Sequence, residues 1–379
     1  MRVDSRPVVF NEVMQIWLAP SAFAPSTGGV EELTLQLARD YQRAGHDVMV
    51  IVHRFPSHLP TEDEVEGVAV RRIPMDLPGR DLRRLAAHPL TLRRQLRALG
   101  ALETPDVVHV QCPATQVLPL SVFCRRHRVP LVITTQGEVT MDAHAVYQRS
   151  ALMRWSLGLG SRTASALTAC SRRAGDDAAT VAPAFANCTV IPNGVDVAQW
   201  EVTPLPSRPV FAAWGRHVEQ KGLDLLIRAF AEVRRELPDA VLRIGGEGEE
   251  TARLRSVAGE GVEFLGPLDR RGVQTLLDSA RVAVVPSRLE PFGIVAVEAM
   301  SAGRTVVWST NGGLADATGG LGHGIDPTDT DMLARAMIDV SRMPLDPRDA
   351  RAHAETLTWN IIGQRYLDLY TDLIEANRA

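Results

Sequence analysis

Two glutamates with seven residues between them mark the stretch SRLEPFGIVAVEAM. Glu290 precedes Pro291, which disfavours helical geometry and places Glu290 in a loop after the apolar run ARVAVVPS. A helix is expected from Gly293 to Gly303, with Glu298 one to two turns inside it. A carboxylate accepts two hydroxyl hydrogen bonds at once, and the free N–H groups of a helix start attract an anion. Either glutamate alone would most often be a solvated side chain, but together they predict a site for an anionic ligand with a diol, such as a sugar or ribose.

Two cations follow another predicted strand. Arg216 and Lys221, in WGRHVEQKGLDLLIRAF, lie between the strand VFAAW and a helix. Arginine bridges oxygens in a fork and lysine acts as a point charge, so the pair suits a diphosphate. Loop cations are usually solvated surface charge. Here the 41 Lys and Arg residues comprise 40 arginines and Lys221 alone, which favours a specific need for lysine at this position.

Three glycine motifs are weaker signals. Gly28 and Gly29 lie between the first predicted strand and helix, and NGG follows a later strand. The motif RIGGEGEE lacks the G-x-G-x-x-G spacing of a dinucleotide fingerprint. A nicotinamide-dependent oxidoreductase is therefore disfavoured.

Composition limits the class of protein. The 379 residues are 45% hydrophobic and 23% charged, as in globular proteins, and allow two domains. A net charge of -4 gives no general attraction to nucleic acid. The N-terminus is too polar for a signal peptide, no apolar run is long enough to span a bilayer, and the four cysteines form no C-x-x-C pair. A reduced, cytoplasmic protein is expected.

Strand and helix patterns alternate in both halves of the chain. Strands are expected at MQIWLAP, DVMVIVHR, DVVHVQ, PLVITTQ and ALTACS, and again at VFAAWG, AVLRIGG, VEFLG, VAVVPS and TVVWST. After Gly324 only helices are expected, and the proline-rich segment 201–209 reads as a linker. The fold class is thus α/β, with two doubly wound, Rossmann-like domains that face a cleft.

In this order, the segments resemble the retaining glycosyltransferases of the GT-B fold, group 1 (family GT4). The similar segments are GGVEE, TACS, IPNGVD, KGLDLLIRAF, LRIGGEG, PSRLEPFGIVAVEAM, STNGG and TWNIIGQRYLDLY. The resemblance covers nearly the whole chain. It implies an acceptor-binding domain at 1–200, a nucleotide-sugar-binding domain at 201–355 and a C-terminal helix at 356–379 that crosses back to the first domain.

The resemblance also implies roles for individual residues. Arg216 and Lys221 would hold the donor diphosphate, and Glu290 the hydroxyls of the transferred sugar. Donor-binding roles fall to the ribose ligand Glu298, to the backbone of Phe292, Gly293 and Ile294, and to Gly28 and Gly29 on the N-terminal side.

The sequence departs from the family pattern at two positions. Gln136 stands where many members have histidine, and Asp316 where many have glutamate. Gln136, Glu138 and His109 are candidate sugar or acceptor contacts. A buried structural role is an equal alternative for His109.

The implied reaction is transfer, with retention, from a nucleoside diphosphate sugar to a hydroxyl acceptor. UDP is preferred over GDP as a family prior, and no metal is expected because the expected loops hold no Asp-x-Asp motif. The leaving diphosphate would itself help to take the acceptor proton. The acceptor is open among a small molecule, a natural product and a lipid-linked glycan.

Eight arginines between Arg71 and Arg97 could meet an anionic membrane peripherally, although a solvated helix face is the favoured interpretation. Two alternative functions stay open. One is a nucleotide-sugar 2-epimerase or hydrolase on the same fold, and the other is a non-catalytic nucleotide-sugar-binding protein.

Overall fold

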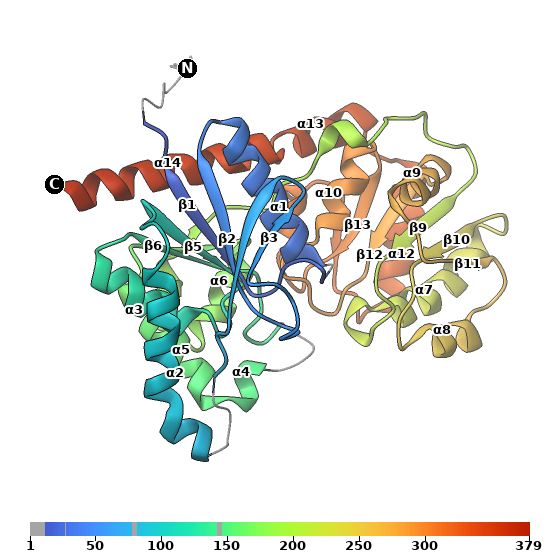
Figure 1. Cartoon of the computed structure of the whole chain (residues 1–379). Coiled ribbons are helices and arrows are strands. Elements are labelled where there is room, and N and C mark those ends of the chain that lie inside the picture. The colour runs from blue at the N-terminus through green and yellow to red at the C-terminus, as the bar shows by residue number, and fades with distance from the viewer. Residues whose placement is uncertain (1–11, 27, 78–81, 142–145) are drawn as a thin grey trace. The chain divides into compact units, whose positions relative to one another are not determined.

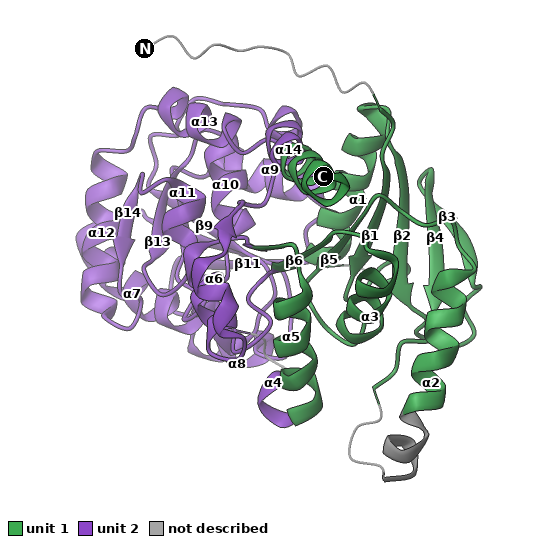
Figure 2. Ribbon diagram, turned by 90° about the vertical axis from the view of Figure 1, so that its left-hand side faces the viewer, with its two compact units in different colours: residues 1–134, 150–167, 366–379 green, residues 135–149, 168–365 purple. Residues whose placement is uncertain are grey.

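The computed structural model describes residues 12–26, 28–77, 82–141 and 146–379 (Figure 1). The chain forms two compact units (Figure 2). Unit 1 comprises Met1–Thr134, Ser150–Leu167 and Tyr366–Ala379. Unit 2 comprises Thr135–Arg149 and Thr168–Arg365.

The first sheet has eight strands in the order β3-β4-β2-β1-β5-β6-β7-β8. The strands are β1 (Gln15–Pro20), β2 (Asp47–His53), β3 (Glu62–Val65), β4 (Val68–Ile73), β5 (Val107–Gln111), β6 (Leu131–Thr135), β7 (Ala166–Ala169) and β8 (Thr189–Val190). The sequence predicts β1, β2, β5, β6 and β7, but not the antiparallel pair β3–β4. The sequence of β3 is EDEV, mostly exposed, so it lacks the apolar alternation on which strand prediction depends.

Helices of the first part of the chain follow the expected pattern. They are α1 (Gly29–Arg43), α2 (Leu82–Gly100), α3 (Val117–His127), α4 (Val146–Arg149), α5 (Ala151–Thr163) and α6 (Arg172–Ala179). Leu33, Leu37 and Tyr41 of α1 are buried. The helix ends just before Gly45, whose φ of +90° is favourable only for glycine. The predicted stop at Gly45 is confirmed.

The second sheet has six parallel strands in the order β11-β10-β9-β12-β13-β14. They are β9 (Val210–Trp214), β10 (Val241–Gly245), β11 (Val262–Gly266), β12 (Val282–Val285), β13 (Thr305–Ser309) and β14 (His323–Ile325). Its helices are α7 (Leu223–Glu236), α8 (Thr251–Val257), α9 (Arg270–Ser279), α10 (Ile294–Ser301), α11 (Leu314–Thr318), α12 (Thr330–Arg342) and α13 (Pro347–Glu355), followed by α14 (Trp359–Arg378). Short 3₁₀ turns lie at Pro183–Asn187, Val197–Gln199 and Glu219–Lys221.

Side chains alternate along β9, as a strand requires. Phe211 and Ala213 join the core formed with α7 and α12, whereas Ala212 packs with Leu276 of α9 on the other face. Trp214 packs on that second face. Chain order reverses between the neighbouring strands β9 and β12, and ligands of doubly wound sheets bind at the carboxyl ends of strands at such a switch point.

Within the described residues, no helix is long and apolar enough to cross a membrane. Two of the eight arginines between Arg71 and Arg97 lie on strand β4 rather than on a helix. Arg72 is buried and donates to Asp63 Oδ2 and to the Ala24 carbonyl, both at 2.7 Å. It therefore offers nothing to an anionic surface. Arg80 and the side chains of Arg83 and Arg84 lie outside the described residues, and the three on the rest of α2 are exposed.

Candidate functional site

A pocket in unit 2 lies at the switch point between β9 and β12. It holds about 420 Å³ of empty space, open solvent included. Its lining comes from the end of β9 and the following turn, from the end of β12, and from the loop that leads into α10. The residues are Ala213, Trp214, Gly215, Arg216, Lys221, Leu223, Val284, Val285, Pro286, Ser287, Glu290 and Val295.

Lys221 and Glu290 meet in this pocket. The Lys221 Nζ lies 2.7 Å from Glu290 Oε2, and Ser287 Oγ donates to the same oxygen at 2.9 Å. The Glu290 side chain is 8% exposed and that of Lys221 27%, so the ion pair is shielded from water mainly on the carboxylate side. Both described contacts go to Oε2, which leaves Oε1 as an acceptor for a ligand hydroxyl.

Glu298 lies one turn inside α10, on the face toward β9. Trp214 donates its indole N–H to Glu298 Oε2 at 3.3 Å. The helix begins at Ile294 after Gly293, whose φ is +91° and which has no side chain to cap the first N–H groups. A Cβ on Gly293 would lie 2.3 Å from Leu314 Cδ2, so a larger residue would have to displace that side chain as well as adopt a strained backbone. Gly303 has a φ of +75° just past the helix, which confirms the predicted stop.

The loop that carries Arg216 rests on the glycines of RIGGEG. A Cβ on Gly246 would lie 1.9 Å from the Gly215 carbonyl oxygen, and one on Gly248 would lie 2.4 Å from the His217 carbonyl oxygen. His217, the next residue of this loop, is fully buried, and its backbone N–H donates to the Glu247 carbonyl at 2.9 Å. Arg216 itself is exposed. These glycines therefore bring two backbone segments together and hold the cation at the rim of the pocket.

The motif NGG supports the loop at Glu290. The Gly313 N–H donates to the Glu290 carbonyl at 2.8 Å, and the Glu290 N–H donates to the Asn311 carbonyl at 3.2 Å. A Cβ on Gly312 would lie 2.1 Å from the Glu290 carbonyl oxygen. In the sequence, NGG is a weak motif. In the structure, its backbone supports the Glu290 loop, which lines the pocket.

Gln136 and Glu138 form a turn after β6 that belongs to unit 2. The Gln136 and Asn193 side-chain amides exchange two hydrogen bonds, of 2.9 and 3.3 Å. Glu138 accepts from the Gln136 N–H at 2.7 Å and from Thr135 Oγ1 at 3.0 Å. Burial raises the pKa of Glu138 to about 7, against these hydrogen bonds, which lower it. The intervening Gly137 packs against Pro291, since a Cβ there would lie 2.7 Å from the proline ring.

Asp316 is bonded to the start of α6. Its Oδ2 accepts from the Arg172 N–H at 2.8 Å, at the start of α6. At the same helix start, Ser171 Oγ caps the Ala174 N–H at 3.0 Å and donates to the Pro291 carbonyl at 2.5 Å. The serine of TACS thus supports the EPFG loop.

Three of the predicted residues belong to unit 1. Gly28 precedes α1 in extended backbone, and a Cβ on it would lie 2.8 Å from Glu31 Oε2, whereas a Cβ on Gly29 would meet nothing within 4 Å. His109 has no exposed surface. Its Nδ1 lies 2.5 Å from Tyr370 Oη and its Nε2 2.6 Å from Thr134 Oγ1, and burial lowers its pKa to about 3. A fully enclosed side chain cannot contact a sugar in this conformation, which favours the structural alternative.

Comparison with known proteins adds independent information. Residues 27–199 match the model of Glycosyltransferase Family 4, and residues 208–342 match that of Glycosyl transferases group 1. Glycogen synthase from Mycobacterium tuberculosis is 32% identical, over 90% of this chain and 91% of the relative. The chain belongs to the group 1 glycosyltransferases of family GT4. This GT4 member is a retaining glycosyltransferase that uses a nucleotide-sugar donor.

Other proteins similar to this chain are named for different substrates. A phosphatidyl-myo-inositol mannosyltransferase from Propionibacterium freudenreichii subsp. shermanii is 28% identical, over 93% of each chain. Sucrose-phosphate synthase from Thermosynechococcus elongatus has a TM-score of 0.71 at 22% identity, over 96% of this chain and all of that one. Anabaena HepE in complex with UDP-glucose has a TM-score of 0.71 at 19% identity, over 95% of this chain and all of that one. The two solved structures show the GT-B fold alone.

Sequence reasoning missed three contributors to the site. Ser287 and Trp214 bind the two glutamates, and Arg288 forms a bidentate ion pair with Asp224 beside them. Ser287 and Arg288 stand within the PSRLEPFG motif, so their position next to Glu290 was the available signal. No group of three or more His, Cys, Asp or Glu side chains in the described residues could hold a metal ion, and independence from metal stays a prediction.

Proposed function

We propose that the pocket of unit 2 binds the nucleoside diphosphate part of the donor and that Lys221 is the principal cation on its diphosphate. The observation that carries the proposal is the meeting of Lys221 and Glu290, from two different strand ends, in one pocket at the switch point. Arg216 at the rim and the uncapped start of α10 add positive potential near the same place.

The arrangement suits a reaction in which negative charge grows on a leaving diphosphate. A preorganised cation and helix start lower the energy of that charge without reorganising during the reaction, which is usually the largest catalytic contribution. The leaving oxygen would take the proton of the acceptor hydroxyl on the same face of the sugar, which retains the anomeric configuration. Glu290 would orient the transferred sugar through Oε1, and Glu298, steadied by Trp214, would accept from the ribose hydroxyls.

UDP is the proposed nucleotide, with GDP second. UDP is supported by its use as a donor nucleotide in the family and by the UDP complexes of Anabaena HepE. GDP comes second because two relatives are named as mannosyltransferases that use GDP-mannose. Calorimetric titration with UDP, GDP and ADP tests the choice. We expect one nucleotide to bind more tightly than the other two, and UDP before GDP. Equally negligible binding of all three would overturn the donor site itself.

The proposed acceptor is a hydroxyl group of a carbohydrate, a lipid-linked glycan or a small natural product. Curated relatives include a glycogen synthase and phosphatidyl-myo-inositol mannosyltransferases, so the support extends to the hydroxyl only. An array of such acceptors with the preferred donor, followed by NMR of the product, tests both transfer and retention. An α-linked product from an α-linked donor is expected. Release of an epimer, or of free sugar with every acceptor, would instead indicate the 2-epimerase or hydrolase. Activity that persists after treatment with EDTA would support a reaction that needs no metal.

A further inference from the structure

Two turns carry the ion pair of the pocket. The first, Glu219–Gly222, precedes α7 and holds Lys221; the second, Pro286–Glu290, follows β12 and ends at Glu290. They are in backbone contact, because a Cβ on Gly222 would lie 2.1 Å from the Pro286 carbonyl oxygen. The distance from Lys221 Nζ to Glu290 therefore depends on how these two turns are fixed to each other.

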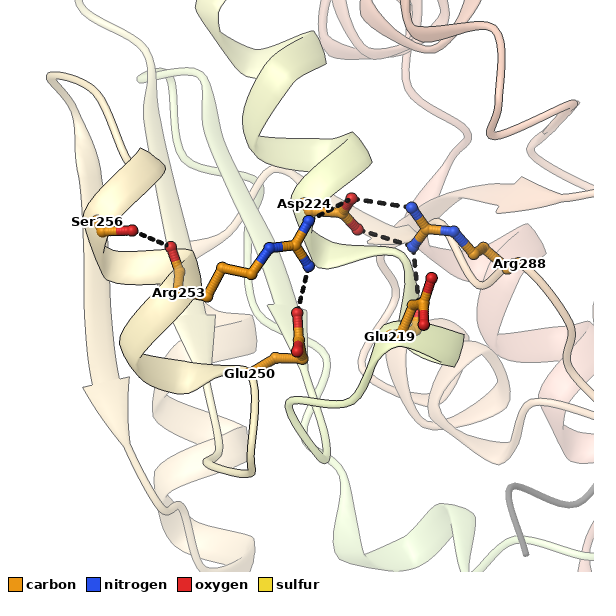
Figure 3. A network of polar contacts seen from close by, with 6 residues as sticks. All are labelled: Glu219, Asp224, Glu250, Arg253, Ser256 and Arg288. Atoms are coloured by element: carbon orange, nitrogen blue, oxygen red, sulfur yellow. Dashed lines mark hydrogen bonds and ion pairs between the residues drawn. The ribbon is translucent and has the colours of Figure 1, made fainter.

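Arg288 makes most of the polar contacts that fix them. Its guanidinium donates NH1 to Asp224 Oδ1 at 2.7 Å and NH2 to Asp224 Oδ2 at 2.8 Å (Figure 3). The same NH1 also donates to the Glu219 carbonyl at 2.8 Å, and the Arg288 backbone N–H donates to the Gln220 carbonyl at 2.8 Å. One residue thus holds the turn of Lys221 at two points and the first turn of α7 at a third.

Gln220 closes the contact from the other side. Its Nε2 donates to the Leu289 carbonyl at 3.0 Å and to the Met141 carbonyl at 2.9 Å. Lys221 and Glu290 are the next residues along each turn. The two turns are therefore joined immediately before the residues that meet in the pocket.

Arg288 does not line the pocket, whereas Pro286, Ser287 and Glu290 of the same turn do. Its guanidinium is directed to Asp224 in the first turn of α7, which is 6% exposed. Hydrogen bonds from Arg288 hold the pKa of Asp224 below its usual value, so this carboxylate stays charged. A bidentate fork of this kind fixes direction as well as distance, which a lysine cannot reproduce.

We infer that Arg288, through its fork on Asp224 and its bond to the Glu219 carbonyl, is a positioning residue that sets Lys221 for the donor diphosphate. The inference rests on the proposed function of the pocket. It predicts that loss of the fork weakens diphosphate binding through Lys221, although Arg288 itself does not line the pocket. If Arg288 served folding alone, Arg288→Lys would lower stability, and any loss of nucleotide affinity would be the same with and without Lys221.

The test is a double-mutant cycle read by calorimetry with UDP, or with GDP or ADP if either binds the wild type more tightly. Arg288→Lys keeps the charge and removes the fork, and we expect about tenfold weaker binding in the wild-type background. In the Lys221→Ala background the same substitution should change affinity less than about twofold, because the group it positions is gone. The fall in melting temperature caused by Arg288→Lys should be the same in both backgrounds.

Arg253→Lys is the matched control. Arg253 also approaches Asp224, at 3.9 Å, but from α8, and its side chain is 53% exposed. It makes none of the described contacts to the two turns, so its substitution should change affinity less than about twofold. Asp224→Asn, which keeps the shape of the partner and removes its charge, should repeat the effect of Arg288→Lys and serves if that variant does not fold.

Two outcomes overturn the inference. One is unchanged nucleotide affinity in folded Arg288→Lys and Asp224→Asn; the other is an equal loss of affinity with and without Lys221. Either result leaves the proposed function standing as long as the wild type binds a nucleoside diphosphate. Absence of binding by the wild type to UDP, GDP and ADP would overturn the proposed function and this inference together.

Discussion

The two sheets differ in what lies at their switch points. In the first sheet, β5 lies next to β1, and its polar side chains bond to other groups of unit 1. Gln111 is buried and accepts from Thr34 of α1 at 2.7 Å, and His109 is enclosed by Tyr370 and Thr134. In the second sheet, β9 and β12 end at an open pocket that contains a charged pair.

Charge follows the same division. The network around His109 consists of a neutral imidazole and hydroxyl groups, since burial lowers the pKa of His109 to about 3. In the network around Glu290, each carboxylate is paired with a cationic side chain, Lys221 for Glu290 and Arg288 for Asp224. One doubly wound architecture can therefore close a switch point with neutral hydrogen bonds for stability, or leave it open and charged for a ligand. The difference predicts which substitutions will affect activity and which will affect stability.

The largest expected effect is at Lys221. Lys221→Ala should lower kcat/KM by about a hundredfold or more, and Lys221→Arg by at least about tenfold, or roughly 1.4 kcal/mol of transition-state stabilisation. The physical reason is that a guanidinium is larger and planar, and would crowd the space beside Glu290 and Arg216. Steady-state kinetics at saturating acceptor give the measurement, with circular dichroism to confirm folding. A fully active arginine variant would make the single lysine an accident of composition.

The two glutamates should separate by kinetic parameter. Glu298→Gln should mainly weaken donor binding and Glu290→Gln mainly slow turnover, each by roughly 1.5–3 kcal/mol for a charged hydrogen bond. The reason is that Glu298 lies inside α10 beside Trp214, whereas Glu290 lies at the helix mouth against Lys221. KM for the donor and kcat distinguish the two. The reverse pattern would exchange the roles assigned to the two residues.

His109 should matter for stability and not for the reaction. Its pKa in the folded protein lies below the value of 6.5 for an exposed histidine. Between these two pKa values the histidine is protonated in the unfolded chain but not in the folded protein. Stability should therefore fall as pH decreases below 6.5, by about 2 kcal/mol at pH 5 from this group.

Urea denaturation at pH 7 and pH 5 measures the His109 effect. In His109→Gln the fall between the two pH values should be smaller, while donor KM at pH 7 stays unchanged. His58→Gln, at an exposed histidine of the same unit, is the control and should keep the wild-type fall. A large rise in donor KM in folded His109→Gln would break the contrast between the two switch points.

The smallest effect is expected at Trp214. Trp214→Phe keeps a ring on the same face of β9 but removes the N–H that donates to Glu298 at 3.3 Å. Because this hydrogen bond is long, its loss should weaken nucleotide affinity by about 1 kcal/mol, or roughly fivefold. Calorimetry with the preferred nucleoside diphosphate measures it. Trp308→Phe, whose indole donates to the Leu321 carbonyl elsewhere in unit 2, should leave the affinity unchanged.

The sequence by itself determined most of the helices and strands and where they begin and end. Strand β12, the loop forced by Pro291, the helix from Gly293 and its stop at Gly303 follow from short-range sterics, which act over a few residues. The motif spacing likewise indicated that two glutamates and two cations serve one site. The charged strand β3 escaped prediction, because its pairing with β4 compensates for a sequence with no apolar pattern.

Only the tertiary structure decided which side chains meet. Lys221 and Glu290 are 69 positions apart, and Asp224 and Arg288 are 64 apart. Their contacts depend on β9 and β12 being neighbours in the sheet, and strand order is set by the packing of whole helices, not by local sequence. His109 received its final environment from Tyr370, 261 positions later. His109 could have lined a site from its strand, but it is enclosed because Tyr366 and Tyr370 of α14 pack against it.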